Sequence, residues 1–280
     1  ADRLQMMKEL GEEMRRHKNS GSSPPENMGL PNGSVQAVLS PHIDYQRGGE
    51  SYAWAYQALK EHGTGSRTFI ILGTSHRPMR HRFVATKKHY DTPFGQIDTD
   101  AELLDELQEA FGGELFQDEF MHADEHTVEL NATYLRHTFP DEDIRIVPIL
   151  VGSFEEFLHT EESPEQNKEI QDFCAALQQV MEKHGDDVAL IGGVDFSHCG
   201  PEFGDEQLNE PEREQEIEQG DRKALDAIEA MDTQSFFESF RPDQNARKVC
   251  SIGTVYCVME AMKERTKARV LNYQQANSED

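Results

Sequence analysis

Apolar and polar positions follow two alternating patterns along this chain of 280 residues. Short runs that are apolar at nearly every position predict strands that are covered on both faces. Longer stretches with an apolar residue every three or four positions predict helices with one buried side. The predicted strands span residues 35–40, 67–76, 144–152, 188–198 and 268–273. The predicted helices span residues 1–20, 49–63, 98–113, 125–139, 163–185, 220–231 and 253–264.

The order of these elements predicts the fold class. Strands and helices alternate through most of the chain, as they do in α/β proteins. We therefore expect a mostly parallel or mixed central sheet flanked by helices on both faces. Residues 1–34 are interpreted as an N-terminal helix and a flexible linker rich in Ser, Pro, Gly and Asn, and residues 35–280 as a single α/β domain. The acidic stretch at 203–221 predicts an exposed loop with helical turns.

The charge of the chain narrows the classes of partner. There are 53 acidic residues against 27 basic ones, which gives a formal net charge of −26. A nucleic-acid backbone is bound by basic surfaces, so we expect no nucleic-acid partner. The acidic excess fits two interpretations, an adaptation to a salty cytoplasm and an ordinary solubilising surface.

The apolar runs and the cysteines predict the compartment. No apolar run reaches the roughly 18 residues that a membrane-spanning helix needs, so we expect no membrane segment. The N-terminus is charged and lacks the apolar segment of a signal peptide, which predicts a cytoplasmic protein. The four cysteines form no CxxC pair and are expected to be reduced thiols.

Three of the predicted strands lead into a histidine, namely His42, His76 and His198. In an open α/β sheet, ligands bind beyond the carboxyl ends of the strands. Imidazole is a common metal ligand and also a general base near neutral pH. Two histidines and one anionic ligand suit a redox-active iron, and the same set can hold zinc or copper. The sequence therefore predicts a metal site at this edge of the sheet.

The anionic ligand has several candidates, and spacing does not choose among them: Asp44, Asp195, Glu125 and Cys250. Cys250 lies where a short loop enters a predicted helix, and a helix N-terminus lowers the pKa of a thiol. A buried, unreactive cysteine is the alternative interpretation. Glu125 and His126 begin the predicted helix at 125–139, where they either cap the helix or reach into the pocket.

Five segments of the chain resemble, in order, the sequence blocks of the Memo family. They are "PHIDYQRGG", "ILGTSH", "DEHTVELNATYL", "RIVPILVGSF" and "GGVDFSHCG". The likeness is greatest to the bacterial and archaeal members known as AmmeMemoRadiSam system protein B, and it covers residues 35–273. The family in turn resembles class III extradiol dioxygenases of the LigB-like fold, in which two histidines and a carboxylate hold a non-haem iron. The resemblance thus implies a LigB-like fold.

The resemblance also implies a set of site residues. His42 and His76 match the two histidine ligands, and Cys250 matches the cysteine that Memo-like proteins have in place of the carboxylate. His198 matches the general acid/base of the dioxygenases, and Asp195 belongs to the same block. The implied cofactor is Fe(II), with copper or zinc as alternatives.

The pocket is expected to include four further residues, namely Asp44, Tyr45, Glu125 and His126. The usual first block of the family reads "PHAGY", and Ile43 and Asp44 replace its small pair here. Asp44 therefore adds a negative charge beside the first histidine.

The function that the resemblance implies is a metal-dependent oxidoreductase that acts on a small organic substrate. Fold alone does not establish function, so two alternatives stay open. One is a non-catalytic adaptor, with a radical-SAM enzyme and an AMMECR1-like protein as its partners. The other is a zinc hydrolase that uses the same histidines.

Overall fold

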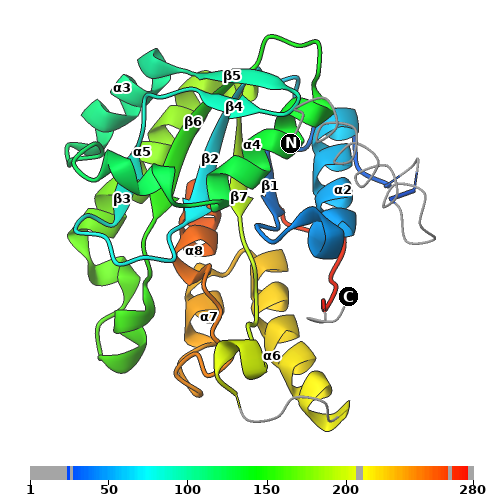
Figure 1. The fold of residues 1–280 in the computed structure, drawn as a ribbon. Helices are drawn as coiled ribbons and strands as arrows, with labels where there is room; N and C mark the ends of the chain where they lie inside the picture. The colour runs from blue at the N-terminus through cyan, green and yellow to red at the C-terminus, as the bar shows by residue number, and fades with distance from the viewer. Residues whose placement is uncertain (1–23, 26–27, 206–210, 264–266, 277–280) are drawn as a thin grey trace.

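A mixed sheet of seven strands lies at the centre of the described part of the molecule (Figure 1). The computed structural model describes residues 24–25, 28–205, 211–263 and 267–276, without the side chains of 211–212. The strands are β1 (Ala37–Ser40), β2 (Thr68–Thr74), β3 (Phe83–Ala85), β4 (Tyr90–Thr92), β5 (Gly95–Thr99), β6 (Arg145–Val151) and β7 (Val188–Gly193). Their order is β1-β7-β2-β6-β5-β4, and β3 pairs with β6.

The direction of the strands confirms the predicted mixed, mostly parallel sheet. The five strands β1, β7, β2, β6 and β5 run parallel to their neighbours. The two short strands β3 and β4 run antiparallel to β6 and β5. The carboxyl ends of β1, β7 and β2 therefore lie side by side at one edge of the sheet.

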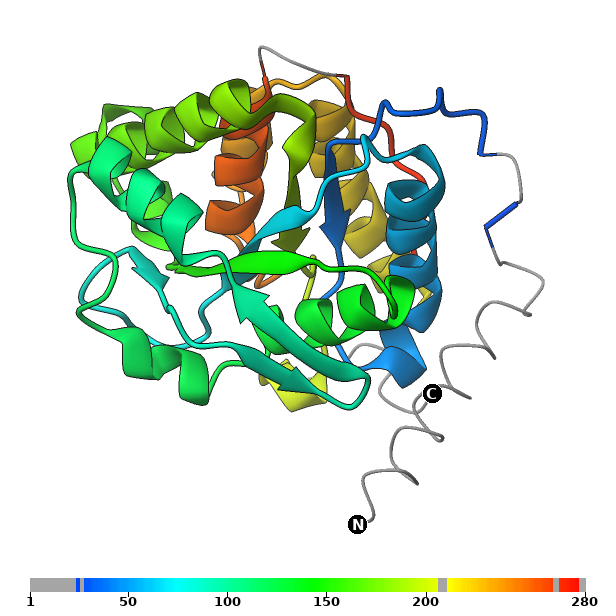
Figure 2. The same cartoon turned by 90° about the horizontal axis from the view of Figure 1, so that it is seen from above.

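Helices cover both faces of the sheet (Figure 2). They are α2 (Tyr45–His62), α3 (Ala101–Phe111), α4 (Thr127–Thr138), α5 (Lys168–His184), α6 (Pro211–Glu229), α7 (Thr233–Glu238) and α8 (Ile252–Met262). Short 3-10 turns are η1 (Glu119–Ala123), η2 (Glu155–His159), η3 (Pro164–Gln166), η4 (Gly185–Asp187) and η5 (Pro201–Phe203). Helices α2 and α4 cover one face, and α3, α5 and α8 cover the other.

The central strands are apolar throughout because both of their faces are buried. In β2, Phe69 and Ile71 belong to the core that contains α2 and α4. Ile70 and Leu72 belong to the core that contains α3, α5 and α8. This arrangement explains why β2 shows a continuous apolar run rather than an alternating pattern.

Two sequence-based predictions in the last third of the chain differ from the structure. Residues 268–273 form no strand. Their backbone and side chains bond to side chains of the helices instead, as Val270 N does to Glu229 and Tyr273 OH does to Asp221. In the predicted loop at 203–221, α6 already begins at Pro211, and a proline is well tolerated in the first turn of a helix.

The remaining differences concern short or terminal elements. The strand predicted for 188–198 ends at Gly193, and the helix predicted to begin at residue 49 begins at Tyr45. The small elements β3, β4, β5 and α7 carry too few residues for a clear periodic pattern. The helix predicted for residues 1–20 lies outside the described residues. Among the described residues, no helix combines the length and the apolar character needed to cross a bilayer.

Candidate metal centre

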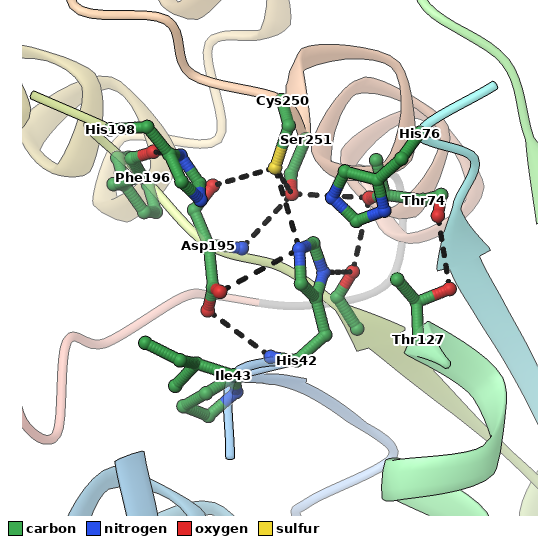
Figure 3. A network of polar contacts seen from close by, with 12 residues as sticks. His42, Ile43, Thr74, His76, Thr127, Asp195, Phe196, His198, Cys250 and Ser251 are labelled. Carbon is green, nitrogen blue, oxygen red and sulfur yellow. Dashed lines mark hydrogen bonds and ion pairs between the residues drawn. The ribbon is translucent and has the colours of Figure 1, made fainter. Parts of the chain in front are cut away.

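His42, His76 and Cys250 converge at the carboxyl edge of the sheet (Figure 3). His42 follows β1 by two residues, His76 follows β2 by two residues, and Cys250 precedes α8 by two residues. One ligand atom from each of the three lies within 4.8 Å of the others. His42 Nε2 is 3.4 Å from Cys250 Sγ, and the two imidazole rings are perpendicular with centroids 5.0 Å apart. Three segments distant in sequence thus present two imidazoles and a thiol to one another.

These donors fit a transition-metal ion. Metal–nitrogen bonds of about 2.0–2.1 Å and metal–sulfur bonds of about 2.3 Å separate two tetrahedral ligands by about 3.5 Å. The observed separation of 3.4 Å between His42 Nε2 and Cys250 Sγ agrees with that spacing. A thiolate with two imidazoles is a donor set for iron, copper or zinc rather than for calcium or magnesium.

The main chain and Asp195 fix the orientation of His42. Its Nδ1 lies 3.0 Å from the carbonyl oxygen of Gly193, which accepts a hydrogen bond from Nδ1–H and leaves Nε2 to face Cys250. The His42 backbone N–H donates to Asp195 Oδ1 at 3.1 Å, and Asp195 Oδ2 lies 3.6 Å from Nε2. His42 is almost completely buried, so its ring has little freedom to turn.

Glu125 orients His76 in the same way. The His76 backbone N–H donates to Glu125 Oε2 at 2.8 Å, and the ring Nδ1 lies 3.1 Å from Oε1. This pairing leaves His76 Nε2 for an ion. The His126 ring stacks on His76 with centroids 5.1 Å apart, and its side chain makes no capping hydrogen bond at the start of α4. Glu125 and His126 therefore both contact His76, and the His126 side chain does not cap the helix.

His76, Glu125 and His126 also form a second group of neighbouring donors, more exposed than the first. The backbone N–H of His126 donates to Glu125 Oε1, and His126 Nδ1 is 3.2 Å from the same oxygen. The Glu125 carboxylate is thus shared by both histidines.

The ionisable groups of the cluster shift one another strongly. Burial lowers the pKa of His42, but Asp195 and Cys250 outweigh it and raise the pKa to about 9. Hydrogen bonds with Cys250 and Glu125 raise the pKa of His76 to about 10. Burial raises the pKa of Cys250, but His42 and His76 outweigh it and lower the pKa to about 6. The raised pKa values of the two histidines and the lowered pKa of Cys250 favour a thiolate beside charged imidazolium groups near neutral pH.

Asp195 and His198 lie on the irregular segment that follows β7. The Asp195 backbone N–H donates to Ser251 Oγ at 2.9 Å rather than to a neighbouring strand. The backbone N–H of His198 donates to the Arg247 carbonyl at 2.8 Å, and His198 Nδ1 lies 2.9 Å from the Phe196 carbonyl. These side-chain and loop contacts replace a sheet ladder, which is why the strand ends before His198.

A network of hydroxyl groups beneath the cluster was not predicted. Thr74 Oγ1 lies 3.1 Å from Ser251 Oγ, 2.8 Å from Thr254 Oγ1 and 3.2 Å from the Gly193 carbonyl. These buried groups join the end of β2, the end of β7 and the start of α8. Hydroxyl residues at the ends of the apolar runs "ILGT" and "CSIGT" were the signal in the sequence.

Two predicted pocket residues lie elsewhere. Asp44 caps the N-terminus of α2, where its carboxylate accepts from the Arg47 backbone N–H and pairs with the Arg47 side chain at 2.7 Å. Tyr45 is buried among the aromatic residues of the core under α2, and its hydroxyl donates to the Leu130 carbonyl. The contacts of these two side chains stabilise α2 and its packing rather than the cluster.

Comparison with known proteins identifies the family. The family described as Memo-like protein matches residues 6–280. Similar MEMO1 family proteins occur in Aquifex aeolicus, with 25% identity over 82% of this chain and 55% of the relative, and in Thermus thermophilus, with 30% identity over 62% and 47%. A MEMO1 family protein of Methanosarcina mazei is 26% identical over 88% of this chain and 80% of the relative. The chain spans about half the length of the Aquifex and Thermus relatives. The match over nearly the whole chain shows that the protein belongs to the Memo family.

Proposed function

We propose that this chain is a metal-dependent oxidoreductase that acts on a small organic substrate. His42, His76 and Cys250 are the proposed ligands, Fe(II) the proposed ion, and copper or zinc the alternatives. The convergence of three donor atoms within 4.8 Å carries the proposal. The pairing of each imidazole Nδ1 with a carbonyl or a carboxylate supports it, because such partners orient metal-binding histidines.

The three donors leave the ion with open positions. A bound iron or copper ion supplies electron transfer and a place for substrate to coordinate. Cys250 contributes the anionic charge of the site, because its thiol has a pKa of about 6. Asp195 adds a second negative charge beside His42 and offsets the charge of a cation bound there.

His198 is the proposed proton carrier. Its Nδ1 is held by the Phe196 carbonyl, so Nε2 is the nitrogen that exchanges a proton with a substrate. The ring of Phe203 packs edge-on against His198 with centroids 5.1 Å apart and is partly exposed. An exposed aromatic ring at this point favours an apolar or aromatic substrate over a highly charged one.

Elemental analysis of protein purified without oxygen tests the metal assignment. We expect about one ion per chain in the wild-type protein, and loss of most of the metal in His76→Ala and Cys250→Ser, because each removes one of three donors. His89→Ala is the matched control, since His89 is exposed and lies beside Asp91 rather than in the cluster. Circular dichroism checks that each variant is folded. Full metal content in His76→Ala would contradict the ligand assignment.

Oxygen uptake separates the oxidoreductase from the hydrolase. The iron-loaded wild-type protein is expected to consume oxygen with at least one of a series of catechols and related small aromatic compounds. His198→Ala should bind the metal normally and consume oxygen more slowly, by about 10²–10⁴-fold, as the loss of a general acid/base predicts. Zinc-supported hydrolysis that proceeds equally well without oxygen, together with no oxygen uptake, would refute the oxidoreductase.

A further inference from the structure

The loop that carries Cys250 has an unusual backbone. Three of its residues, Gln244, Asn245 and Lys248, have φ angles of 50°, 59° and 54°. Residues other than glycine rarely adopt this left-handed backbone conformation. It persists only where surrounding contacts hold it. Asn245 supplies some of these contacts, because its amide bonds to both backbone groups of Val249. The loop therefore depends on contacts that fix it just before Cys250.

Arg247 provides a second set of these contacts. Its guanidinium Nη1 lies 2.7 Å from Oδ1 of Asp221 on α6, and both side chains are buried. Asp221 also accepts hydrogen bonds from Ser197 Oγ at 2.6 Å and from Tyr273 OH at 3.0 Å. A buried ion pair is retained only where its charges are well satisfied, and this carboxylate has three donors. The pair thus has one well-defined arrangement.

The backbone of Arg247 connects this ion pair to the metal centre. Its carbonyl oxygen accepts the backbone N–H of His198 at 2.8 Å and the thiol of Cys199 at 3.7 Å. A Cβ added at Gly220 would lie 2.6 Å from the guanidinium, which shows that helix α6 packs directly on it. Arg247 therefore joins α6, the loop with Cys250 and the segment with Asp195 and His198.

We infer that Arg247 and Asp221 are positioning residues for the metal centre. Their buried ion pair holds the Cys250 thiol and the His198 ring in place relative to His42. The inference rests on the proposed role of Cys250 as a ligand. If the ion pair only supported the fold, its loss would lower stability without changing the bond between the Cys250 sulfur and the ion. If it positions the thiol, its loss also changes that bond.

Titration with Co(II) under anaerobic conditions distinguishes these roles, because a thiolate bound to Co(II) gives a charge-transfer band in the near ultraviolet. The variants are Arg247→Met, Asp221→Asn and Arg247→Lys, with Arg241→Met as the control. Arg241 pairs with Glu238 and bonds to the carbonyls of Phe157 and Thr160, away from the cluster. Thermal unfolding of the metal-free proteins checks that each variant is folded.

We expect Arg247→Met and Asp221→Asn to bind Co(II) about 10–100-fold more weakly than the wild-type protein, as loss of a supporting partner does, and to show a weakened or shifted band. Arg247→Lys keeps the charge and should retain more of the band, and Arg241→Met should match the wild type. If a folded Arg247→Met or Asp221→Asn shows wild-type affinity and an unchanged band, the positioning role is overturned. A wild-type protein without the thiolate band would instead refute Cys250 as a ligand, and the inference with it.

Discussion

At the scale of single residues, the chemistry of Cys250 depends on its two histidine neighbours. Burial by itself raises the pKa of a thiol, and the buried Cys257 has a pKa well above its ordinary value. Cys250 is shifted the other way, to a pKa of about 6, because His42 and His76 stabilise its thiolate. The two thiols should therefore ionise, and react, at different pH values.

Alkylation of metal-free protein with iodoacetamide tests this difference. Only the thiolate reacts, so the rate at Cys250 should rise with pH and reach half of its maximum near pH 6, where the depressed pKa lies. His76→Ala removes one hydrogen bond to the sulfur and should move the midpoint to higher pH. Mass spectrometry of the labelled peptides gives the rate at each cysteine.

Two comparisons within the same experiment support the interpretation. The buried Cys174 and Cys257 should stay unlabelled while the protein is folded. Addition of Zn(II) should slow the reaction at Cys250, because a bound ion occupies the sulfur. A midpoint for Cys250 above pH 8 would show that the histidines do not stabilise its thiolate.

The residue scale also shows which parts of the site could be predicted. Histidines at the ends of apolar runs could be recognised from the chain alone, as could a cysteine at the start of a helix. The roles of Asp44 and Glu125 could not, because both are acidic residues near a helix start. Asp44 caps its own helix through Arg47, three residues away, while Glu125 reaches His76, which lies 49 residues away beyond the end of β2. The local signal is of the same kind for Asp44 and for Glu125, so it cannot tell the two roles apart.

At the scale of secondary-structure elements, the close approach of α4 to the sheet brings Glu125 and His126 to the cluster. A Cβ added at Gly73 in β2 would lie 2.4 Å from Thr127 Oγ1 and 2.7 Å from Val128 Cγ2. A Cβ added at Gly193 in β7 would lie 2.8 Å from Asn131 Nδ2. Two glycines therefore let the first turns of α4 rest directly on the strands.

Gly73→Ala is expected to destabilise the protein, because the methyl group must push α4 away from β2. Overpacking of this kind lowers the free energy of unfolding by about 1–3 kcal/mol, which urea denaturation measures. The matched control is Gly152→Ala, since the nearest atoms to a Cβ there lie at an ordinary distance of 3.4 Å. Equal stability of the two variants would mean that α4 does not need this close contact.

Element boundaries show why some local predictions failed. A strand of three residues, such as β3 or β4, contains less than two periods of an alternating pattern, so periodicity cannot identify it. The segment after β7 is apolar at Val194 and Phe196 and continues the pattern of the strand. Its backbone nevertheless leaves the sheet, because Asp195 N–H bonds to Ser251 and His198 N–H bonds to Arg247.

At the scale of the whole molecule, the dominant property is the net charge of −26. Like charges on a compact chain repel one another and lower its stability, and added salt screens this repulsion. We therefore expect the melting temperature at pH 7 to rise between 50 mM and 1 M NaCl. The rise should be about 2–4 °C for each kcal/mol of repulsion that is removed.

The same salt series near pH 5 is the control for charge. The sequence pI is about 4.8, so the net charge is small there and the salt effect should largely disappear. An equal rise at both pH values would mean that NaCl acts through hydrophobic burial rather than through screening.

The sequence by itself determined the fold class, the continuous burial of the central strands, and the residues whose side chains carry candidate metal-binding atoms. These are local properties, because periodicity reports which faces of an element are buried, and the residue type alone decides which donor atoms a side chain carries. The same local information identified the family blocks and the histidines at the strand ends.

The tertiary structure decided which of these residues meet. The order β1-β7-β2 places the ends of three strands side by side, so His42 contacts Asp195, 153 residues away, and Cys250, 208 residues away. Tertiary packing places the Cys250 thiol beside both imidazoles. It also pairs Glu125 with His76 and Arg247 with Asp221. The physical reason is that contacts between distant segments follow from strand order and helix packing, which no local pattern encodes.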